Sequence, residues 1–243
     1  SWRLRPYRAP HHSTTAIALV GTDGRPGEVS LAHNGVLFLD ELPEWGRHAL
    51  QMLREPLETG HVIVSRAARQ SEYPARFQLV AAMNPCPCGW AGDTGGRCRC
   101  NSETINRYRA RISGPLLDRI DLHVDVPRLP PEALREDAPR GESSGEVRAR
   151  VVAARDRQLA RAGVPNALLD QSATDATCRL AAQDRALLER AITALDLSAR
   201  SLHRILRVAR TIADHGASDD IATRHVTEAI GYRTLDRGSG ATR

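Results

Sequence analysis

The sequence predicts an α/β domain followed by an all-α domain, and three observations support this division. The stretch GVLFLDEL (35–42) is a short apolar run ending in two acids, which is typical of a buried parallel strand. The stretch 128–145 is rich in Pro, Ser, Gly and charge, as linkers are. Beyond it the apolar residues follow helical spacing. We therefore expect an α/β domain over 1–128, a linker over 129–145 and a helical domain over 146–243.

The composition is that of an ordinary globular protein, with 41% hydrophobic and 26% charged residues. No apolar run approaches the ~18 residues of a membrane span, and the first residues lack the apolar core of a signal peptide. We therefore expect a cytoplasmic protein with reduced thiols and no membrane association. The net charge of +5 and a pI of about 9.3 mildly favour a polyanionic partner. The sequence contains no lysine, which we attribute to a compositional bias toward arginine.

The α/β domain is expected to begin with loops and short elements over 1–34, in which His11-His12 and His33-Asn34 order the loops or, alternatively, contact a metal or phosphate. After the strand 35–42, leucines at helical spacing predict one helix over 48–58. The later elements expected here are a β-hairpin over 61–80 with a basic turn, whose second strand runs on to Val80, a helix over 103–114 and a strand over 122–127.

The second domain is expected to consist of helices over 146–162, 184–195, 198–215 and 223–233. Ser198 is placed to cap the third of these helices. That helix carries an apolar stripe formed by Leu202, Ile205, Ala209 and Ile212.

The acids Asp40 and Glu41 directly follow the predicted buried strand. A P-loop ATPase needs this arrangement, because one carboxylate holds Mg²⁺ and the next polarises the attacking water. Asn84 ends the following strand, where a polar side chain can orient that water. The alternative is that the strand ends in a solvated acidic turn. Arg119, within LDRID, lies where a ring ATPase places an arginine finger; the alternative is a salt bridge to Asp118 or Asp121.

Four of the five cysteines, Cys86, Cys88, Cys98 and Cys100, lie in one short loop with the spacing C-x-C-x9-C-x-C. Four thiolates suit one structural Zn²⁺, and the glycines of the loop allow it to fold back. Labile disulfides, free thiols and an iron–sulfur cluster remain open as alternatives. Cys178 stands apart in a helical region, where we expect it to be a buried packing residue.

Four segments taken together resemble the ComM/YifB family of magnesium-chelatase-like AAA+ ATPases, relatives of the MCM replicative helicases. The resemblance extends from about Arg5 to Arg237. It implies a partial AAA+ P-loop NTPase core, with a hairpin insert and a cysteine loop, followed by an all-α lid domain. The segments that carry it are GVLFLDELPEW, ARFQLVAAMNPCPCG, SGPLLDRIDLHVDVP and LSARSLHRILRVARTIAD.

The resemblance implies a role for individual residues in binding and hydrolysing ATP with Mg²⁺. Asp40 and Glu41 match the Walker B acids, of which Asp40 would bind the Mg²⁺ of Mg-ATP and Glu41 would be catalytic. Asn84 matches sensor 1, Arg119 the arginine finger, and Arg200 the sensor 2 arginine of the lid.

The resemblance also implies a contact with DNA. The hairpin 61–77 matches the pre-sensor-1 hairpin, which faces the ring pore in MCM-type helicases. Arg66 and Arg69 at its tip are therefore our candidates for DNA contact, because arginine pairs well with phosphate oxygens. The alternative is a solvated basic turn.

The Walker A loop of the family, G-x-x-x-x-G-K-[ST], is not present in a chain without lysine. We therefore expect the chain to be the C-terminal part of a longer protein and to have negligible ATPase activity alone. The parent is expected to be a hexameric DNA helicase or branch-migration motor in natural transformation or recombination. The alternatives are a metal-chelatase motor subunit and a non-enzymatic zinc-binding assembly module.

Overall fold

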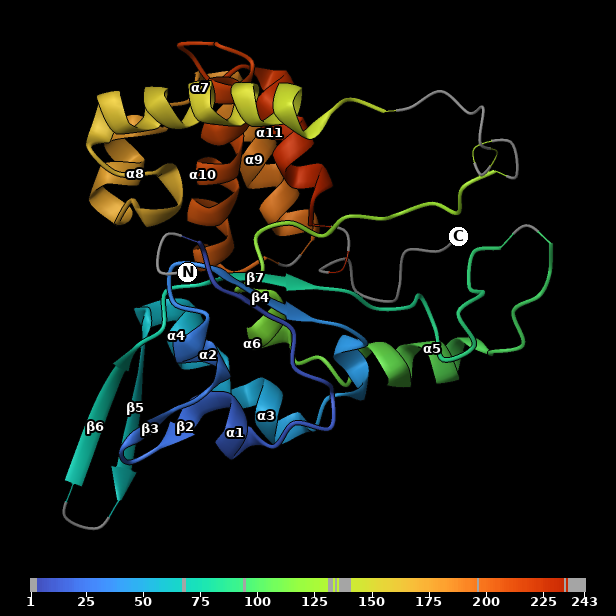
Figure 1. Ribbon diagram of the computed structural model, residues 1–243. Helices are drawn as coiled ribbons and strands as arrows, with labels where there is room; N and C mark the ends of the chain where they lie inside the picture. The colour runs from blue at the N-terminus through green and yellow to red at the C-terminus, as the bar shows by residue number, and fades with distance from the viewer. Residues whose placement is uncertain are drawn as a thin grey trace. The chain divides into compact units, whose positions relative to one another are not determined.

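A computed structural model shows two compact units, residues 1–120 and 121–243 (Figure 1). The division falls after Ile120, N-terminal to the predicted boundary, and residues 131, 132, 134 and 136–140 of the predicted linker lie outside the described residues. At Arg66, Arg69 and Ala199 only the backbone is described. The structure describes residues 4–66, 69–93, 95–130, 133, 135, 141–195, 197–233 and 235.

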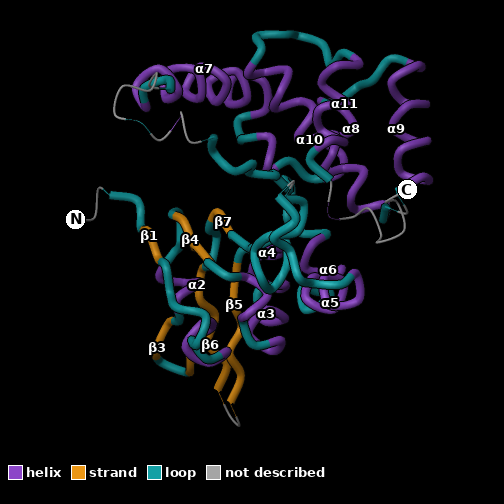
Figure 2. The backbone as a smooth tube through the Cα atoms, turned by 90° about the vertical axis from the view of Figure 1, so that its right-hand side faces the viewer, coloured by secondary structure: helices purple, strands orange, loops and turns teal. Residues whose placement is uncertain are grey.

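The first unit is built on a three-stranded sheet with the order β1-β4-β7 (Figure 2). Its strands are β1 (Tyr7–Arg8), β4 (Val36–Leu39) and β7 (Gln78–Ala81), and both pairings are parallel. Leu37 and Leu39 are fully buried on one face of β4. The predicted parallel strand within 35–42 is thus confirmed, and the α/β class of this unit with it.

Short helices cover the sheet and supply the rest of its core. Leu19, Leu53 and Leu116 join the strand leucines at zero exposure, and burial of each such side chain contributes roughly 1.5–3 kcal/mol. The helices are α1 (Ala16–Val20), α2 (Glu28–Leu31), η1 (Leu42–Glu44), α3 (Arg47–Met52), α4 (Arg54–Thr59), α5 (Ser102–Arg109) and α6 (Gly114–Leu117).

The single helix predicted over 48–58 is wrong: the segment forms α3 and α4, which meet at Leu53. Pro56 explains the break. Proline has no N–H to donate, and its ring clashes with the carbonyl four residues earlier, here that of Met52. Met52 is the last residue of α3. The helix over 103–114 is also shorter than predicted, since α5 ends at Arg109.

The predicted hairpin is confirmed in its first part and wrong in its second. β5 (His61–Arg66) pairs with β6 (Arg69–Pro74) as a separate antiparallel sheet. The chain then leaves this sheet, and β7 is a new strand beside β4. Pro74 ends β6, as expected for a residue that cannot donate to a strand ladder. Figure 1 shows the hairpin reaching away from the three-stranded sheet.

A second, smaller hairpin braces the first. β2 (Gly21–Thr22) pairs with β3 (Arg25–Pro26). The Tyr73 hydroxyl donates to the Thr22 carbonyl at 3.1 Å, and the Ser71 hydroxyl donates to Asp23 Oδ1 at 2.7 Å. The long hairpin is therefore tied to the rest of the first unit through β6, and the last described pair, Arg66 and Arg69, lies beyond these bonds.

The second unit is all-helical, as predicted. Its 310-helix η3 (Asn166–Leu168) and its helix α8 (Gln171–Thr177) were not foreseen. The other helices are α7 (Ser144–Ala162), α9 (Ala182–Ala194), α10 (Ala199–His215) and α11 (Thr223–Gly231).

Helix α10 carries the predicted apolar stripe. Ile205 and Ala209 are buried, and Leu202 and Ile212 pack beside them in the core of this unit. The Ser198 side chain accepts from Ser201 N at 3.3 Å, which confirms the predicted cap. Among the described residues, no helix combines the length and the apolar character that a membrane crossing requires.

The strand predicted over 122–127 is wrong, because these residues belong to no sheet. The backbone N–H of His123 instead donates to the Tyr232 carbonyl beyond α11 at 2.8 Å. An alternating apolar pattern predicts a strand only when a partner strand completes its ladder, and this segment pairs with no strand among those described.

Candidate functional site

The exits of the three parallel strands meet at one edge of the sheet. His12 follows β1, Asp40 and Glu41 follow β4, and Asn84 follows β7; we call these four residues the strand-end site. The β4 and β7 exits are tied together, since Ala82 N donates to the Leu39 carbonyl at 3.0 Å and Leu42 N to the Ala82 carbonyl at 2.9 Å. Ligands of α/β proteins bind outside the carboxyl ends of such strands.

The acid pair is fixed through its backbone and leaves its carboxylates in solvent. The indole N–H of buried Trp45 donates to the Asp40 carbonyl at 2.9 Å, and Glu41 N donates to Asp40 Oδ1 at 2.8 Å. Glu41 has φ of 50°, a left-handed conformation that costs free energy in any residue with a side chain. Asp40 and Glu41 are both exposed. The turn therefore holds two carboxylates outward at the sheet edge.

His12 is the member of this site that sequence reasoning did not place. Its Nδ1 lies 2.9 Å from Glu41 Oε2. The ring of His11 lies against that of His12, with centroids 4.0 Å apart. The sequence predicts for His11 and His12 only the ordering of a loop or a contact with a metal or phosphate. The two-residue strand β1, parallel to β4, is the signal that brings residue 12 beside residue 41, and it is too short to read from periodicity.

Asn84 lies between the sheet and the cysteine loop, with its side chain exposed. A Cβ on Gly89 would lie 4.0 Å from Asn84 Oδ1, so the amide lies near the turn that contains Gly89. The backbone N–H of Asn84 donates to the hydroxyl of Tyr108, from α5. Burial raises the pKa of Tyr108. Asn84 is thus held from two sides by segments outside the sheet.

The predicted arginines lie in different surroundings. The Arg119 guanidinium donates to Glu58 and, at 2.6 Å, to the Pro115 carbonyl. The ion pair with Glu58 was not foreseen. Arg200 is exposed in the first turn of α10, within the second unit. Arg66 and Arg69 are cross-strand partners at the tip of the hairpin, and their side chains lie outside the described residues.

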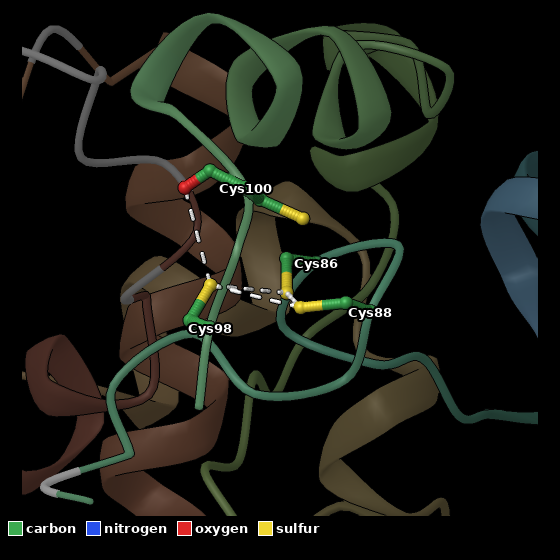
Figure 3. A group of neighbouring side chains, drawn as sticks. All are labelled: Cys86, Cys88, Cys98 and Cys100. Atoms are coloured by element: carbon green, nitrogen blue, oxygen red, sulfur yellow. Dashed lines mark hydrogen bonds between the residues drawn. The ribbon is translucent and has the colours of Figure 1, made fainter. Parts of the chain in front are cut away.

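The four cysteines form one cluster, the four-cysteine site (Figure 3). Cys86 Sγ lies 3.3 Å from Cys88 Sγ and 3.9 Å from Cys98 Sγ, and all four sulfurs lie within 4.8 Å of one another. Zn²⁺ with bonds of about 2.3 Å to four sulfurs gives S···S separations of about 3.8 Å in a tetrahedron. None of the four is joined in a disulfide. The cluster therefore fits a four-coordinate thiophilic metal ion.

Backbone N–H groups point at the sulfurs. Ala91 N donates to Cys86 Sγ at 3.3 Å, and the backbones of Arg99 and Trp90 hydrogen bond to Cys88. These bonds, with a contribution from Cys86, lower the pKa of Cys88 to about 6. Hydrogen-bond donors stabilise the thiolate, the form that binds metal.

The far end of the cysteine loop is closed by Arg97. Its guanidinium donates to both carboxylate oxygens of Asp93, at 2.9 and 2.6 Å, and lies 3.8 Å from the ring centroid of Trp90. This arginine lowers the pKa of Asp93 to about 2. By contrast, Cys178 is buried in the helical core, and desolvation raises its pKa to about 11, which confirms the predicted packing role.

Two protein families match the chain. The magnesium chelatase subunit ChlI family matches residues 1–134, and the family of the ChlI C-terminal domain matches residues 141–233.

Individual proteins show the same similarity. The chain is 50% identical over 239 residues to competence protein ComM of Haemophilus influenzae, covering 98% of this chain and 47% of that protein. It is also 50% identical over 238 residues to YifB of Escherichia coli, covering 97% and 47%. The chain thus corresponds to somewhat less than half of each. A 60-residue stretch is 33% identical to the magnesium-chelatase 38 kDa subunit of Acidiphilium rubrum, covering 25% and 17%.

Proposed function

The chain belongs to the magnesium-chelatase-like AAA+ family that includes ComM and YifB, and on that premise we propose that it carries the hydrolytic half of an ATP-driven motor acting on DNA. The observation that supports this most strongly is the strand-end site. Two exposed carboxylates, a histidine and an asparagine come together at the carboxyl edge of a parallel sheet.

In this proposal each residue has a distinct task. Asp40 would hold Mg²⁺, which when bound with ATP neutralises phosphate charge. Glu41 accepts a proton from the attacking water, His12 holds the Glu41 carboxylate in place, and Asn84 orients the water. The left-handed turn at Glu41 gives the carboxylate its direction.

We propose that the isolated chain does not turn over ATP. It contains no lysine, and the P-loop lysine reaches the β- and γ-phosphates in P-loop ATPases. The appropriate test object is this chain joined to the part of its Haemophilus relative that the similarity does not cover, in which we expect the Walker A loop. We call it the joined protein. Mg²⁺-dependent ATP hydrolysis by the joined protein, absent from the isolated chain, is the expected result. Equal activity in both would contradict the proposal.

Arg119 and Arg200 would act only when several copies of the protein assemble. We propose a homo-oligomeric ring, expected to be a hexamer, in which Arg119 leaves Glu58 and contacts the nucleotide of a neighbour, while Arg200 contacts nucleotide from the lid. The proposal requires Arg119 to break its ion pair with Glu58 before it can contact the nucleotide of the neighbouring subunit. Glu58→Ala should therefore leave hydrolysis by the joined protein intact, whereas Arg119→Ala should abolish it.

The proposed DNA contact is the tip of the β5–β6 hairpin, in a cytoplasmic protein of positive net charge. The name of the Haemophilus relative, a competence protein, is our reason for placing the motor in natural transformation. Fluorescence anisotropy with labelled single-stranded and forked DNA tests the contact. Arg66→Ala with Arg69→Ala should weaken binding about tenfold and lower the salt dependence of log K by about 2.

The matched control is Arg107→Ala with Arg109→Ala on α5, which removes the same charge elsewhere in the first unit. Equal losses in the two double variants would mean that net charge, rather than the hairpin, drives DNA binding.

We further propose that the four-cysteine site holds one structural Zn²⁺. Protein purified under reducing conditions should contain about one zinc per chain by elemental analysis. Cys88→Ser should lose this metal, and Cys178→Ser, which alters a buried thiol outside the site, should keep it. Iron in place of zinc would instead assign the iron–sulfur alternative.

A metal-chelatase motor subunit is the second candidate function. The ChlI family match and the similarity to the Acidiphilium subunit favour it. A chelatase motor requires no DNA contact, so absence of DNA binding by the joined protein would favour this candidate. A non-enzymatic zinc-binding module would follow if the joined protein bound ATP without hydrolysing it.

A further inference from the structure

We propose that the four-cysteine site positions Asn84, so that its metal occupancy sets the hydrolytic rate of the strand-end site. This inference rests on the proposed ATPase function. It concerns what the metal does for that site, and its first test requires no ATP hydrolysis.

The first argument is the place of Asn84 between two anchors. β7 ends at Ala81, and the last backbone bond to the β4 segment is that of Ala82. Asn84 is therefore beyond the ladder that orders the strands. The next fixed point along the chain is Cys86, which is fully buried and contributes a sulfur to the cluster. The conformation of Asn84 thus depends on whether Cys86 is held.

The second argument is the turn that carries the first two cysteines. Gly89 N donates to the Cys86 carbonyl at 3.0 Å, and Gly89 has φ of 78°. This turn places Gly89 near the Asn84 amide, whose Oδ1 would lie 4.0 Å from a Cβ on Gly89. A metal bound to Cys86 and Cys88 would fix the turn, and the turn in its fixed form limits the positions that the amide can take.

The third argument is the path of the chain after the last cysteine. Asn101 follows Cys100 and caps α5, accepting from Thr104 N at 2.8 Å. Tyr108 of α5 is buried and bonds to the Asn84 backbone. Beyond the helix, Arg111 pairs with Glu44 at 2.8 Å. The loop therefore leaves the strand-end site at Asn84 and returns to it through α5.

Without a metal, this loop lacks its cross-link. It contains several glycines, three of them with positive φ at positions 89, 92 and 96. Glycine has the largest conformational entropy to lose on ordering. A metal joined to both ends of the loop offsets that entropy. Loss of the metal should consequently release Asn84 before it disturbs the buried strands β4 and β7.

Hydrogen exchange measured by mass spectrometry on the 243-residue chain is the first test. The zinc-loaded chain is compared with the chain stripped by a chelator and with the stripped chain after zinc is restored. Exchange in peptides covering 82–90 and 102–112 should accelerate at least tenfold on stripping and recover on reloading. Peptides of β4 and α10 should change less than twofold.

Two results would overturn the proposal. One is unchanged exchange around Asn84 when bound zinc is removed, and the other is purified chain that binds no metal at all. Because metal is removed and restored in the unmutated chain, a folding defect of a cysteine variant cannot imitate either result.

Steady-state hydrolysis by the joined protein is the second test. Asn84→Ala and Cys88→Ser should each lower kcat by roughly 10- to 100-fold, with KM for ATP within threefold, since misplacement of a catalytic group costs rate. The double variant should be no slower than the slower single variant, because both changes remove the same interaction. Cys178→Ser is the control and should keep the full rate.

Additive losses in the double variant would show that the cysteines act independently of Asn84. Absence of hydrolysis in the unmutated joined protein would refute the ATPase function, and the exchange experiment would still decide whether the metal orders Asn84.

Discussion

The two units differ in the exposure of the acidic residues Asp40 and Glu41 on the one hand and Asp214 on the other. In the first unit Asp40 and Glu41 stand exposed at the end of β4. In the second unit the Asp214 side chain is 1% exposed and is bound by Arg161, by Arg210 at 3.2 Å, and by Asn166 at 2.8 Å. A buried charge is tolerated when its partners satisfy it, whereas an exposed one keeps its capacity for a ligand.

We propose that this difference separates residues that serve hydrolysis from those that serve packing. The turn after β4 holds Glu41 in a left-handed conformation, which costs stability. Asp214 joins α7 and α10, and its removal would leave buried arginine charge without compensation. Substitutions of Asp40 and Glu41 should therefore alter rate, and substitution of Asp214 should alter stability.

Glu41→Gln is expected to have the largest effect. The amide keeps the shape of the side chain but cannot accept a proton, so hydrolysis by the joined protein should fall by about 100- to 10,000-fold. Nucleotide binding, measured by equilibrium dialysis with Mg²⁺ present, should stay within threefold. A hydrolytic rate within twofold of the unmutated protein would remove Glu41 from the catalytic role.

Asp214→Ala should have the largest effect on stability. It breaks a buried ionic network, and the free energy of unfolding of the second unit should fall by about 3–5 kcal/mol. Urea denaturation followed by circular dichroism provides the measurement. The control, Asp175→Ala, removes an acid that is 62% exposed beside His203, and should cost no more than about 0.5 kcal/mol. Equal losses would mean that burial does not distinguish the two acids.

His12→Ala should have an intermediate effect, because Glu41 keeps its carboxylate but loses the side chain that orients it. Hydrolysis by the joined protein should fall about tenfold, as expected when a catalytic group loses its orientation. His11→Ala removes the neighbouring ring and should cost less. If His11→Ala proved the more harmful, the loop as a whole, rather than the contact to Glu41, would be the important feature.

The smallest expected effect is that of helix caps, which the two units share. Ser198→Ala at α10 and Asn101→Ala at α5 each remove a side chain that accepts from a backbone N–H in the first turn. Each should cost about 1 kcal/mol. Thermal unfolding should show similar losses in both units. An Asn101 cap worth several times more would reveal extra coupling of α5 to the cysteine loop.

The acid pair, the apolar stripe of α10 and the four-cysteine site could all be predicted from the sequence. These features depend on local spacing: four apolar residues before two acids, a period near 3.6, and two closely spaced cysteine pairs. For the same reason Ser198 was recognisable as a cap, since its role involves only residues of its own first turn.

Local spacing does not predict features that depend on residues far apart in the sequence. β1 is two residues long, and only its alignment with β4 defines it. The contact of His12 with Glu41 follows from that alignment. Conversely, the alternating segment 122–127 has strand character but no strand partner among those described. Pro56 alone predicts the break between α3 and α4. The helical spacing of the leucines continues across it and led to the prediction of one helix.

One paired measurement tests the central claim, that exposed acids of the first unit serve hydrolysis and the buried acid of the second serves stability. ATP turnover and urea unfolding are measured for Glu41→Gln and Asp214→Ala in the joined protein, at a temperature where both variants are folded. The account predicts that Glu41→Gln loses turnover while its unfolding free energy stays within about 0.5 kcal/mol, and that Asp214→Ala keeps turnover within a few-fold while losing stability. Glu41→Gln with unchanged turnover would contradict it.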